Sequence, residues 1–299
     1  MKKYWEDIIM KIGVSSYSLI KLVNDGSIKQ IDVISLAKEI GFDVIEFIPF
    51  ILEEGETSEE FAARAKEECE RVGIEMGSYT VGADFIKGSN GDLDAEIERV
   101  KREVDIARIL GAKTMRHDAT IGFPADHVGP RDFDAALPRL VKGCRAVAEY
   151  AQQFGIKTMI ENHGYFCQDS DRVEKLINQV NHPNFGLLLD MGNFVCVDEE
   201  PEKAIGKLMP YAFHVHAKDF HIKSGMLPNP GEGWFRSRGG NYLRGAIIGH
   251  GDVPILQCMK IMKDSGYTGV LSIEFEGMED PILAVRIGLQ NLRKYLEII

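Results

Sequence analysis

The sequence predicts one α/β domain, a (β/α)8 barrel of the TIM type that spans residues 1–299. Short apolar runs alternate with longer amphipathic runs along the whole chain, which is the pattern of alternating strands and helices. The apolar runs are hydrophobic throughout, which favours a parallel sheet covered by helices on both faces. We also find no linker and no break in composition, so the units fit a single closed barrel.

Each strand of the barrel corresponds to one apolar run. In chain order, the predicted strands are residues 11–17, 44–50, 75–81, 113–119, 157–163, 186–191, 212–218 and 269–275. The clearest predicted helices are residues 58–72, 93–110, 132–154 and 280–298, in which apolar residues recur three and four positions apart. Glycines that favour helix ends precede several strands, at Gly41, Gly73, Gly111, Gly155 and Gly266.

Two features of the chain qualify this architecture. An open, doubly wound sheet is the alternative fold, but residues 13–17 after the first strand lack a G-x-G-x-x-G turn.

Residues 220–254 are rich in Gly and Pro and show little periodicity, which predicts a long loop between strands seven and eight. A loop of this length at the catalytic end of a barrel is typical of a lid over substrate, although a solvated insertion is the alternative.

Composition and charge narrow the classes of partner. The chain has 35 Lys+Arg and 46 Asp+Glu, a formal net charge of −11, which disfavours nucleic acid and anionic membranes as partners. Its five cysteines form no C-x-x-C pair, which is typical of free thiols in a reducing cytoplasm. The first ten residues, MKKYWEDIIM, do not resemble a secretion signal, and no apolar run is long enough to span a membrane. We therefore expect a cytoplasmic protein.

Ionisable residues follow the apolar runs of four successive strands. They are Glu161 and His163 in IENHG, Asp190 in LLLDMGN, His214, His216 and Lys218 in HVHAKD, and Glu274 and Glu276 in SIEFEG. A single residue of this kind at a strand end is more often a capping or surface group than a ligand. Burying three carboxylates together, however, requires a cation among them. The concurrence on four adjacent strands therefore predicts a metal site.

The predicted ligand set is Glu161, Asp190, His216 and Glu274, three carboxylates and one imidazole around one divalent ion. Oxygen-rich ligation favours Mn²⁺, with Mg²⁺ close behind, and the imidazole also suits Co²⁺ or Zn²⁺. Three carboxylates exceed the charge of such an ion, and Lys218 would offset the remainder.

The strings IENHG, LLLDMGN, HVHAKD and SIEFEG, in this order and spacing, resemble the xylose isomerase-like TIM-barrel superfamily. Its members include ketose 3-epimerases and inosose isomerases, with endonuclease IV as a distant relative. The resemblance implies that Glu161, Asp190, His216 and Glu274 are metal ligands. It also implies that Glu161 and Glu274 act on the two faces of the substrate. The sequence departs from the pattern at Asn193, where many epimerases have a substrate-contacting His.

The ligand set predicts proton-transfer chemistry on a carbonyl-bearing polyol. The ion would act as a Lewis acid and stabilise an enediolate, while one catalytic carboxylate removes a carbon-bound proton and the other returns one. Return of the proton to the opposite face gives epimerisation, and return to the neighbouring carbon gives isomerisation. Loss of a β-substituent instead gives a lyase, such as an inosose-type dehydratase or an enzyme that eliminates from a 3-keto-glycoside.

Further polar residues are predicted to line the substrate pocket. The substrate-binding candidates are His163, Lys218, Asn193 and His117. A structural hydrogen bond would equally explain His163. Glu46 is a further candidate for lining the pocket, and a core or ion-pair role would equally explain Glu46 and His117. A DNA-directed phosphodiesterase would need further His ligands that are missing here, and a non-catalytic sugar-binding barrel remains as an alternative. We expect a small sugar or polyol as substrate and, from the exposed ring of helices, a homo-oligomer.

Overall fold

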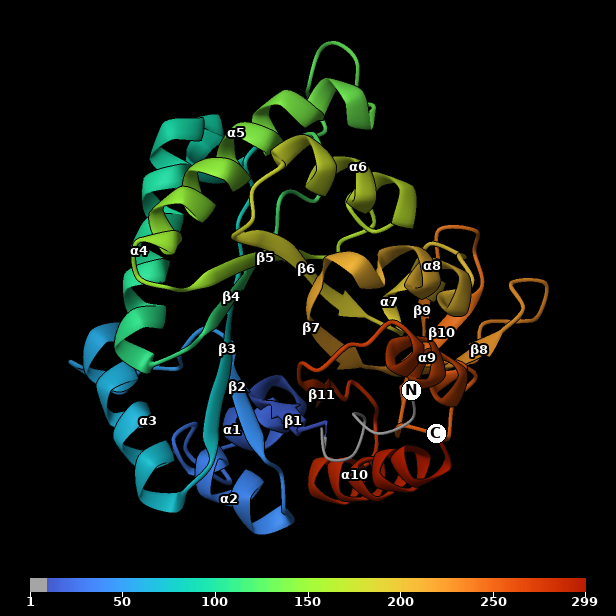
Figure 1. Ribbon diagram of the computed structural model, residues 1–299. Helices are drawn as coiled ribbons and strands as arrows, with labels where there is room; N and C mark the ends of the chain where they lie inside the picture. Colours follow the sequence, from blue (N-terminus) through green and yellow to red (C-terminus); the bar gives the residue numbers. More distant parts are fainter. Residues whose placement is uncertain (1–9) are drawn as a thin grey trace, which may run out of the picture.

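A computed structural model describes residues 10–299 of the chain. Eight parallel strands close into a barrel in the order β1-β11-β7-β6-β5-β4-β3-β2, and helices surround it (Figure 1). The barrel strands are β1 Ile12–Ser15, β2 Val44–Phe47, β3 Glu75–Val81, β4 Thr114–His117, β5 Lys157–Glu161, β6 Phe185–Asp190, β7 Ala212–Ala217 and β11 Leu271–Ile273. The predicted (β/α)8 barrel is confirmed. The prediction that the chain carries no secretion signal concerns mainly residues 1–9, which lie outside the described residues.

Helices follow the strands in alternation. Their bounds are α1 Ile20–Asn24, α2 Asp32–Ile40, α3 Ser58–Val72, α4 Leu93–Leu110, α5 Phe133–Gln152, α6 Ser170–Val180, α7 Asn193–Cys196, α8 Pro201–Leu208, α9 Ile255–Asp264 and α10 Pro281–Ile298. Short 3-10 helices occupy Ser16–Leu19, Gly88–Gly91 and Met209–Tyr211. The four helices predicted from periodicity all form, and their ends lie within two residues of the expected positions.

The ends of α3 show why the sequence predicted its bounds so well. The Thr57 hydroxyl accepts a hydrogen bond from the Glu60 backbone N–H, and the Glu60 side chain accepts one from the Thr57 N–H. This reciprocal pair satisfies two N–H groups that a helix start leaves without partners. At the other end Gly73 adopts a left-handed φ of 71°, which terminates the helix and turns the chain into β3.

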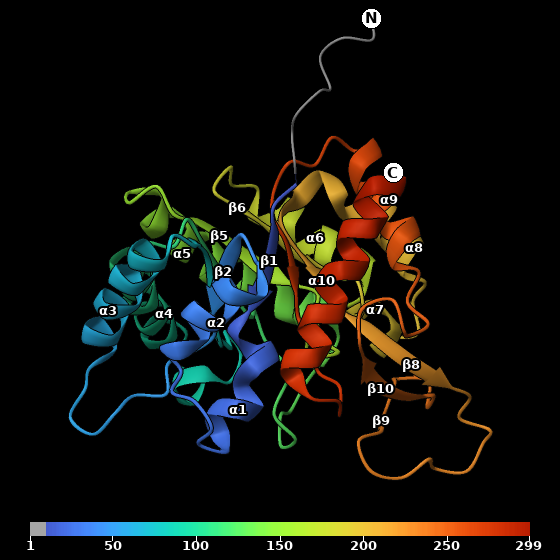
Figure 2. The same cartoon turned by 90° about the horizontal axis from the view of Figure 1, so that it is seen from below.

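The segment between β7 and the last barrel strand differs from the prediction of a long loop. It contains a three-stranded antiparallel sheet of β8 Asp219–Lys223, β10 Tyr242–Ala246 and β9 Phe235–Arg236, with β10 in the centre. The small sheet lies outside the ring of parallel strands (Figures 1 and 2). The sequence did not predict these strands because Gly and Pro divide the segment into short runs. In runs of this length, an alternation of apolar and polar residues is not recognisable.

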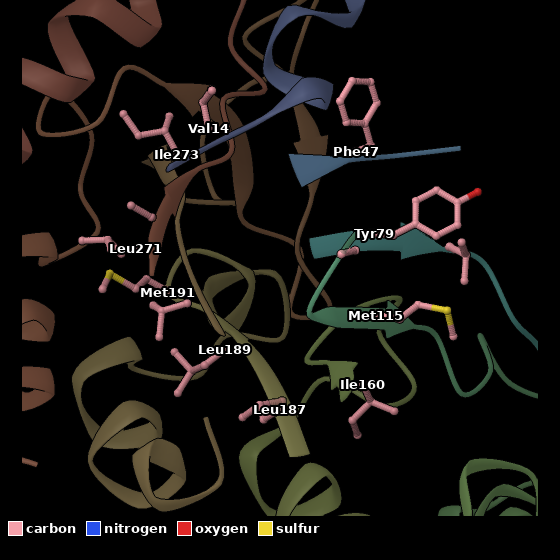
Figure 3. Close-up of a cluster of buried hydrophobic side chains, with 14 of the residues drawn as sticks. Val14, Phe47, Tyr79, Met115, Ile160, Leu187, Leu189, Met191, Leu271 and Ile273 are labelled. Atoms are coloured by element: carbon pink, nitrogen blue, oxygen red, sulfur yellow. The ribbon is translucent and has the colours of Figure 1, made fainter. Parts of the chain in front are cut away.

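The hydrophobic core lies between the barrel wall and the helices. Figure 3 shows its side chains arranged around the ring of strands, with Leu187, Leu189 and Met191 on β6 and its extension, and Leu271 and Ile273 on β11. Because side chains alternate across a strand, the residues between them face the barrel interior. Those residues include Asp190 on β6 and Ser272 on β11.

In the described residues, no helix combines the length and the apolar composition that a membrane span requires. All five cysteines lie in that part of the chain, where each is buried and carries a free thiol.

Candidate metal centre

The four predicted ligands converge at the carboxyl end of the barrel. Glu161 is the last residue of β5, Asp190 the last of β6, His216 lies in β7, and Glu274 directly follows β11. Each offers one ligand atom, and these atoms all lie within 4.8 Å of one another. All four residues are buried. The register of the parallel strands brings together residues that are far apart in sequence.

The orientation of Asp190 leaves one of its oxygens directed at the cluster. Its Oδ1 accepts hydrogen bonds from the backbone N–H groups of Gly192 and Asn193, both at 2.8 Å. Its Oδ2 is buried without a hydrogen-bond partner, as is Nδ1 of His216, 3.7 Å away. Buried polar atoms without a partner are costly in a folded protein. A bound cation would satisfy both atoms, so the residues present fit a metal ion.

Lys218 is the cation that the structure places beside these carboxylates. Its Nζ lies 2.5 Å from Oε2 of Glu274, 3.1 Å from Oε1 of Glu276 and 3.4 Å from Oδ2 of Asp190. Burial alone would lower the pKa of Lys218, but attraction to Asp190 and Glu274 outweighs it and holds the pKa well above its usual value. Lys218 therefore remains charged inside the barrel mouth.

The carboxylate of Glu274 responds in the opposite direction. Burial would raise its pKa, but Lys218 and His216 outweigh burial and hold the pKa well below its usual range. The neighbouring Glu276 has a raised pKa, chiefly because the surrounding protein desolvates it and, in part, because Glu274 repels it. Glu274 is thus ionised and available as a ligand or a base.

Asn193 connects the two sides of the cluster. Its Nδ2 donates to Oε1 of Glu161 at 2.8 Å, and its Oδ1 accepts from Nζ of Lys218 at 3.2 Å. The second oxygen of Glu161 lies 2.6 Å from Nη2 of Arg116. Asn193, predicted as a substrate-binding residue, therefore lies next to the candidate ligands.

Arg116 was missed by the sequence analysis. It lies on β4 and is almost completely buried, between Glu161 and Asp118, whose Oδ1 is 2.9 Å from Nη2. The signal was present in the sequence, because an arginine within a barrel strand, here Thr114–His117, requires a buried carboxylate partner.

His163 and His117 occupy different environments. Nδ1 of His163 lies 3.0 Å from Oδ1 of Asp118, and the side chain is 46% exposed. Desolvation by the surrounding protein lowers the pKa of His163, but the hydrogen bond with Asp118 and attraction to Glu161 together outweigh it and raise the pKa overall. His117 follows Arg116 on β4 and is fully buried, with its ring against Phe85 and Phe185. Strand alternation places His117 on the helix side of β4, apart from the cluster.

Glu46 and His214 lie behind His216, deeper in the barrel. Oε1 of Glu46 is 2.5 Å from Nε2 of His216, and Oε2 is 2.7 Å from Nε2 of His214. His214 also hydrogen bonds with Oγ of Ser272 at 3.1 Å. Burial would raise the pKa of Glu46, but His216 and His214 outweigh it and lower the pKa to about 2. These three residues form a second group whose ligand atoms lie close enough to hold an ion.

Asp219 anchors the turn that leads from the small sheet back into the barrel. Its carboxylate accepts hydrogen bonds from the backbone N–H groups of Gly249, Gly251, Val253 and Phe220. The residue is buried and lies one position after Lys218. Asp219 therefore fixes the backbone of residues 249–253 and is not one of the candidate metal ligands.

The fold and this cluster define the class of protein: a TIM barrel with a buried carboxylate–imidazole centre at the carboxyl end of its strands. The chain belongs to the xylose isomerase-like TIM barrel family, whose model matches residues 34–295. The resemblance inferred from the sequence motifs is confirmed.

Curated relatives of this chain are named as dehydratases. Inosose dehydratase 1 of Bacillus cereus is 27% identical over 164 residues, which cover 49% of this chain and 48% of the relative. Inosose dehydratase of Clostridium perfringens is 26% identical over 169 residues, 53% of each chain. The chain spans about half the length of the curated relatives it matches.

Solved structures with the same fold carry other activities in their names. A D-psicose 3-epimerase crystallised in the presence of D-fructose matches with a TM-score of 0.71 and 19% identity, over 96% of this chain and 99% of the other. The 3-keto-D-glucoside 4-epimerase of E. coli matches with a TM-score of 0.69 and 16% identity, over 96% of this chain and 100% of the other. At this identity the likeness shows the fold alone.

Proposed function

We propose that this protein is a divalent-metal-dependent isomerase or epimerase of an uncharged keto sugar or cyclitol. The observation that carries the proposal is the cluster of Glu161, Asp190, His216 and Glu274, in which Asp190 and His216 each have a buried atom without a hydrogen bond. Three carboxylates and one imidazole favour Mn²⁺, while Mg²⁺, Co²⁺ and Zn²⁺ fit the same donors. The ion would polarise the substrate carbonyl and lower the energy of the enediolate.

Glu161 and Glu274 are the proposed proton-transfer groups. They come from β5 and from the residue after β11, so the substrate would lie with one carboxylate at each face. One takes the proton from the carbon next to the carbonyl, and the other returns a proton to the opposite face or to the neighbouring carbon. Arg116 and Asn193 hold Glu161, while Lys218 holds Glu274, so both carboxylates are oriented before substrate arrives.

The charge of the centre favours an uncharged substrate. The carboxylates within ion-pair distance of Arg116 or Lys218 are Asp118, Glu161, Asp190, Glu274 and Glu276. Among the described residues in contact with them, the two permanent cations are Arg116 and Lys218, and both are paired. Five negative charges against two positive ones leave a net negative charge, and one divalent ion reduces this charge but does not neutralise it. A sugar phosphate or a sugar acid would therefore be repelled.

A lyase on the same barrel is the second candidate. It is favoured by the curated relatives, which are named inosose dehydratases. The same proton abstraction would then be followed by loss of a β-substituent, as water from an inosose or as the aglycone from a 3-keto-glycoside.

Incubation with ketohexoses, inososes and 3-keto-glycosides in D2O with added Mn²⁺ tests the proposal. Deuterium at the carbon next to the carbonyl in an otherwise intact skeleton supports an isomerase or epimerase. Loss of water or aglycone supports the lyase instead. Protein treated with a chelator and the Glu161→Gln variant serve as controls, since both should leave the substrate unlabelled. Labelling by the chelated protein would refute the metal dependence.

A further inference from the structure

We propose that Glu46 is a positioning residue for the metal centre, holding the Nε2 proton of His216 so that Nδ1 presents its lone pair to the ion. The inference rests on the proposed function and assigns a role to a side chain that lies outside the predicted ligand set. Glu46 comes from β2 and is separated from His216 by 170 residues in the sequence.

The two ring nitrogens of His216 face different groups. Nε2 lies 2.5 Å from Oε1 of Glu46, within hydrogen-bond distance. Nδ1 lies 3.6 Å from Oε2 of Glu274 and 3.7 Å from Oδ2 of Asp190, and it has no hydrogen-bond partner. A neutral imidazole carries one proton and one lone pair, so a proton held at Nε2 leaves the lone pair on Nδ1.

Burial gives this contact its effect. Glu46 and His216 are each 1% exposed, so water does not compete for the hydrogen bond between them. A carboxylate that accepts the far N–H of a metal-ligating histidine fixes the orientation of the ring and raises its basicity as a ligand. Glu46 would thus act on the ion through His216, without contacting it.

His214 and Ser272 lie beside Glu46 in the same buried group. Nε2 of His214 lies 2.7 Å from the other oxygen of Glu46 and 3.1 Å from Oγ of Ser272. All three side chains are buried on inward-facing positions of β2, β7 and β11. Ser272 therefore provides a matched control, because it belongs to the same buried group but its hydroxyl pairs with His214 and makes no hydrogen bond to His216.

The first experiment measures Mn²⁺ affinity by calorimetry on the full chain. Glu46→Gln preserves the shape of the side chain but replaces a charged acceptor with a neutral amide. We expect Mn²⁺ to bind about 10- to 100-fold more weakly to this variant, the loss typical when such a partner is removed. Ser272→Ala should bind Mn²⁺ as the native chain does. Equal losses in both variants would indicate general damage to the buried group and would overturn the inference.

The second experiment observes the ring of His216 directly, and its decisive result comes from the native protein. In ¹⁵N-labelled, Zn²⁺-loaded protein, long-range ¹H–¹⁵N spectra should show His216 with a slowly exchanging proton on Nε2 and none on Nδ1. In Glu46→Gln that proton should exchange faster. A proton on Nδ1 in the loaded native protein would refute the assignment, whatever the stability of the variant.

The outcomes separate this inference from the proposed function. Native protein without saturable Mn²⁺ binding would refute both. Native protein that binds one ion per chain, with Glu46→Gln binding it equally well, would refute the positioning role alone. Two ions per native chain and one in Glu46→Gln would make Glu46 a ligand, shared with His214 and His216, and would also overturn the positioning role.

Discussion

Replacing Lys218 with methionine should destabilise the metal-free protein strongly and increase its response to Mn²⁺. Lys218 is 3% exposed and lies within 3.4 Å of oxygens of Glu274, Glu276 and Asp190. Methionine keeps most of the volume but leaves the buried carboxylates of Asp190 and Glu274 without this cation. Removing one partner of a buried ion pair typically costs about 3–5 kcal/mol.

The expected shift in melting temperature follows from the size of the chain. An unfolding entropy of about 2.1 cal/mol/K per residue gives about 0.6 kcal/mol/K for 299 residues. A loss of about 3–5 kcal/mol therefore lowers the melting temperature by roughly 5–8 °C. Lys218 also competes with the ion for Glu274, so its loss should tighten Mn²⁺ binding. Tenfold tighter binding would enlarge the Mn²⁺-induced shift by about 2 °C.

Scanning calorimetry of chelated and Mn²⁺-saturated protein measures both effects. Lys203→Met is the matched control, because Lys203 pairs with Glu200 at 2.6 Å but is 72% exposed. Surface pairs of this kind contribute about 0–1 kcal/mol, so its melting temperature should change by less than about 2 °C. Two results would refute these effects. One is an equal melting temperature for chelated Lys218→Met and chelated native protein. The other is an Mn²⁺-induced shift no larger in the variant than in the native chain.

Three further predictions concern the metal centre and the barrel. Glu161→Gln and Glu274→Gln should each lower kcat by at least about 100-fold with an unchanged circular dichroism spectrum, because general acid–base groups contribute factors of about 10²–10⁴; a variant with full turnover would lose its assigned role. Chelation should abolish turnover and lower the melting temperature. Mn²⁺ added at about 100 times its Kd should raise the free energy of unfolding by about 2.7 kcal/mol, which calorimetry measures. Glu96 accepts hydrogen bonds from Asp84, Ser89 and Arg99, and although burial raises its pKa, these contacts lower it overall. The stability difference between native protein and Glu96→Gln should therefore be complete above about pH 4.3 and decline as pH falls further, measured by urea unfolding; a difference independent of pH would contradict it.

The barrel was predictable because each unit carries local signals. The runs that became β3 and β6, and the helices α3 and α4, were found within a residue of their ends, since caps and apolar periodicity are encoded locally. The small sheet was not predictable, because the pairing of Asp219–Lys223 with Tyr242–Ala246 depends on tertiary contacts across a turn-rich segment.

The candidate ligands were predictable for a different reason. Glu161, Asp190 and Glu274 stand out because ionisable residues follow several successive apolar strands, and the barrel topology determines that the ends of these strands meet. Arg116 and the role of Glu46 were not predicted, because their partners lie on other strands. Which carboxylate an inward-facing residue meets depends on strand register, and register is visible only once the sheet is closed.

Position 193 is Asn in this chain, where many epimerases of the family have His. A histidine there could exchange a proton with substrate, whereas the Asn193 amide has no titratable proton near neutral pH. Asn193 instead spans Glu161 and Lys218, and Lys218 contacts Glu274. Movement of either proposed proton-transfer carboxylate therefore disturbs a network shared with the other. Under the proposed mechanism, proton transfer is assigned to Glu161 and Glu274, and Asn193 links Glu161 to the lysine that orients Glu274.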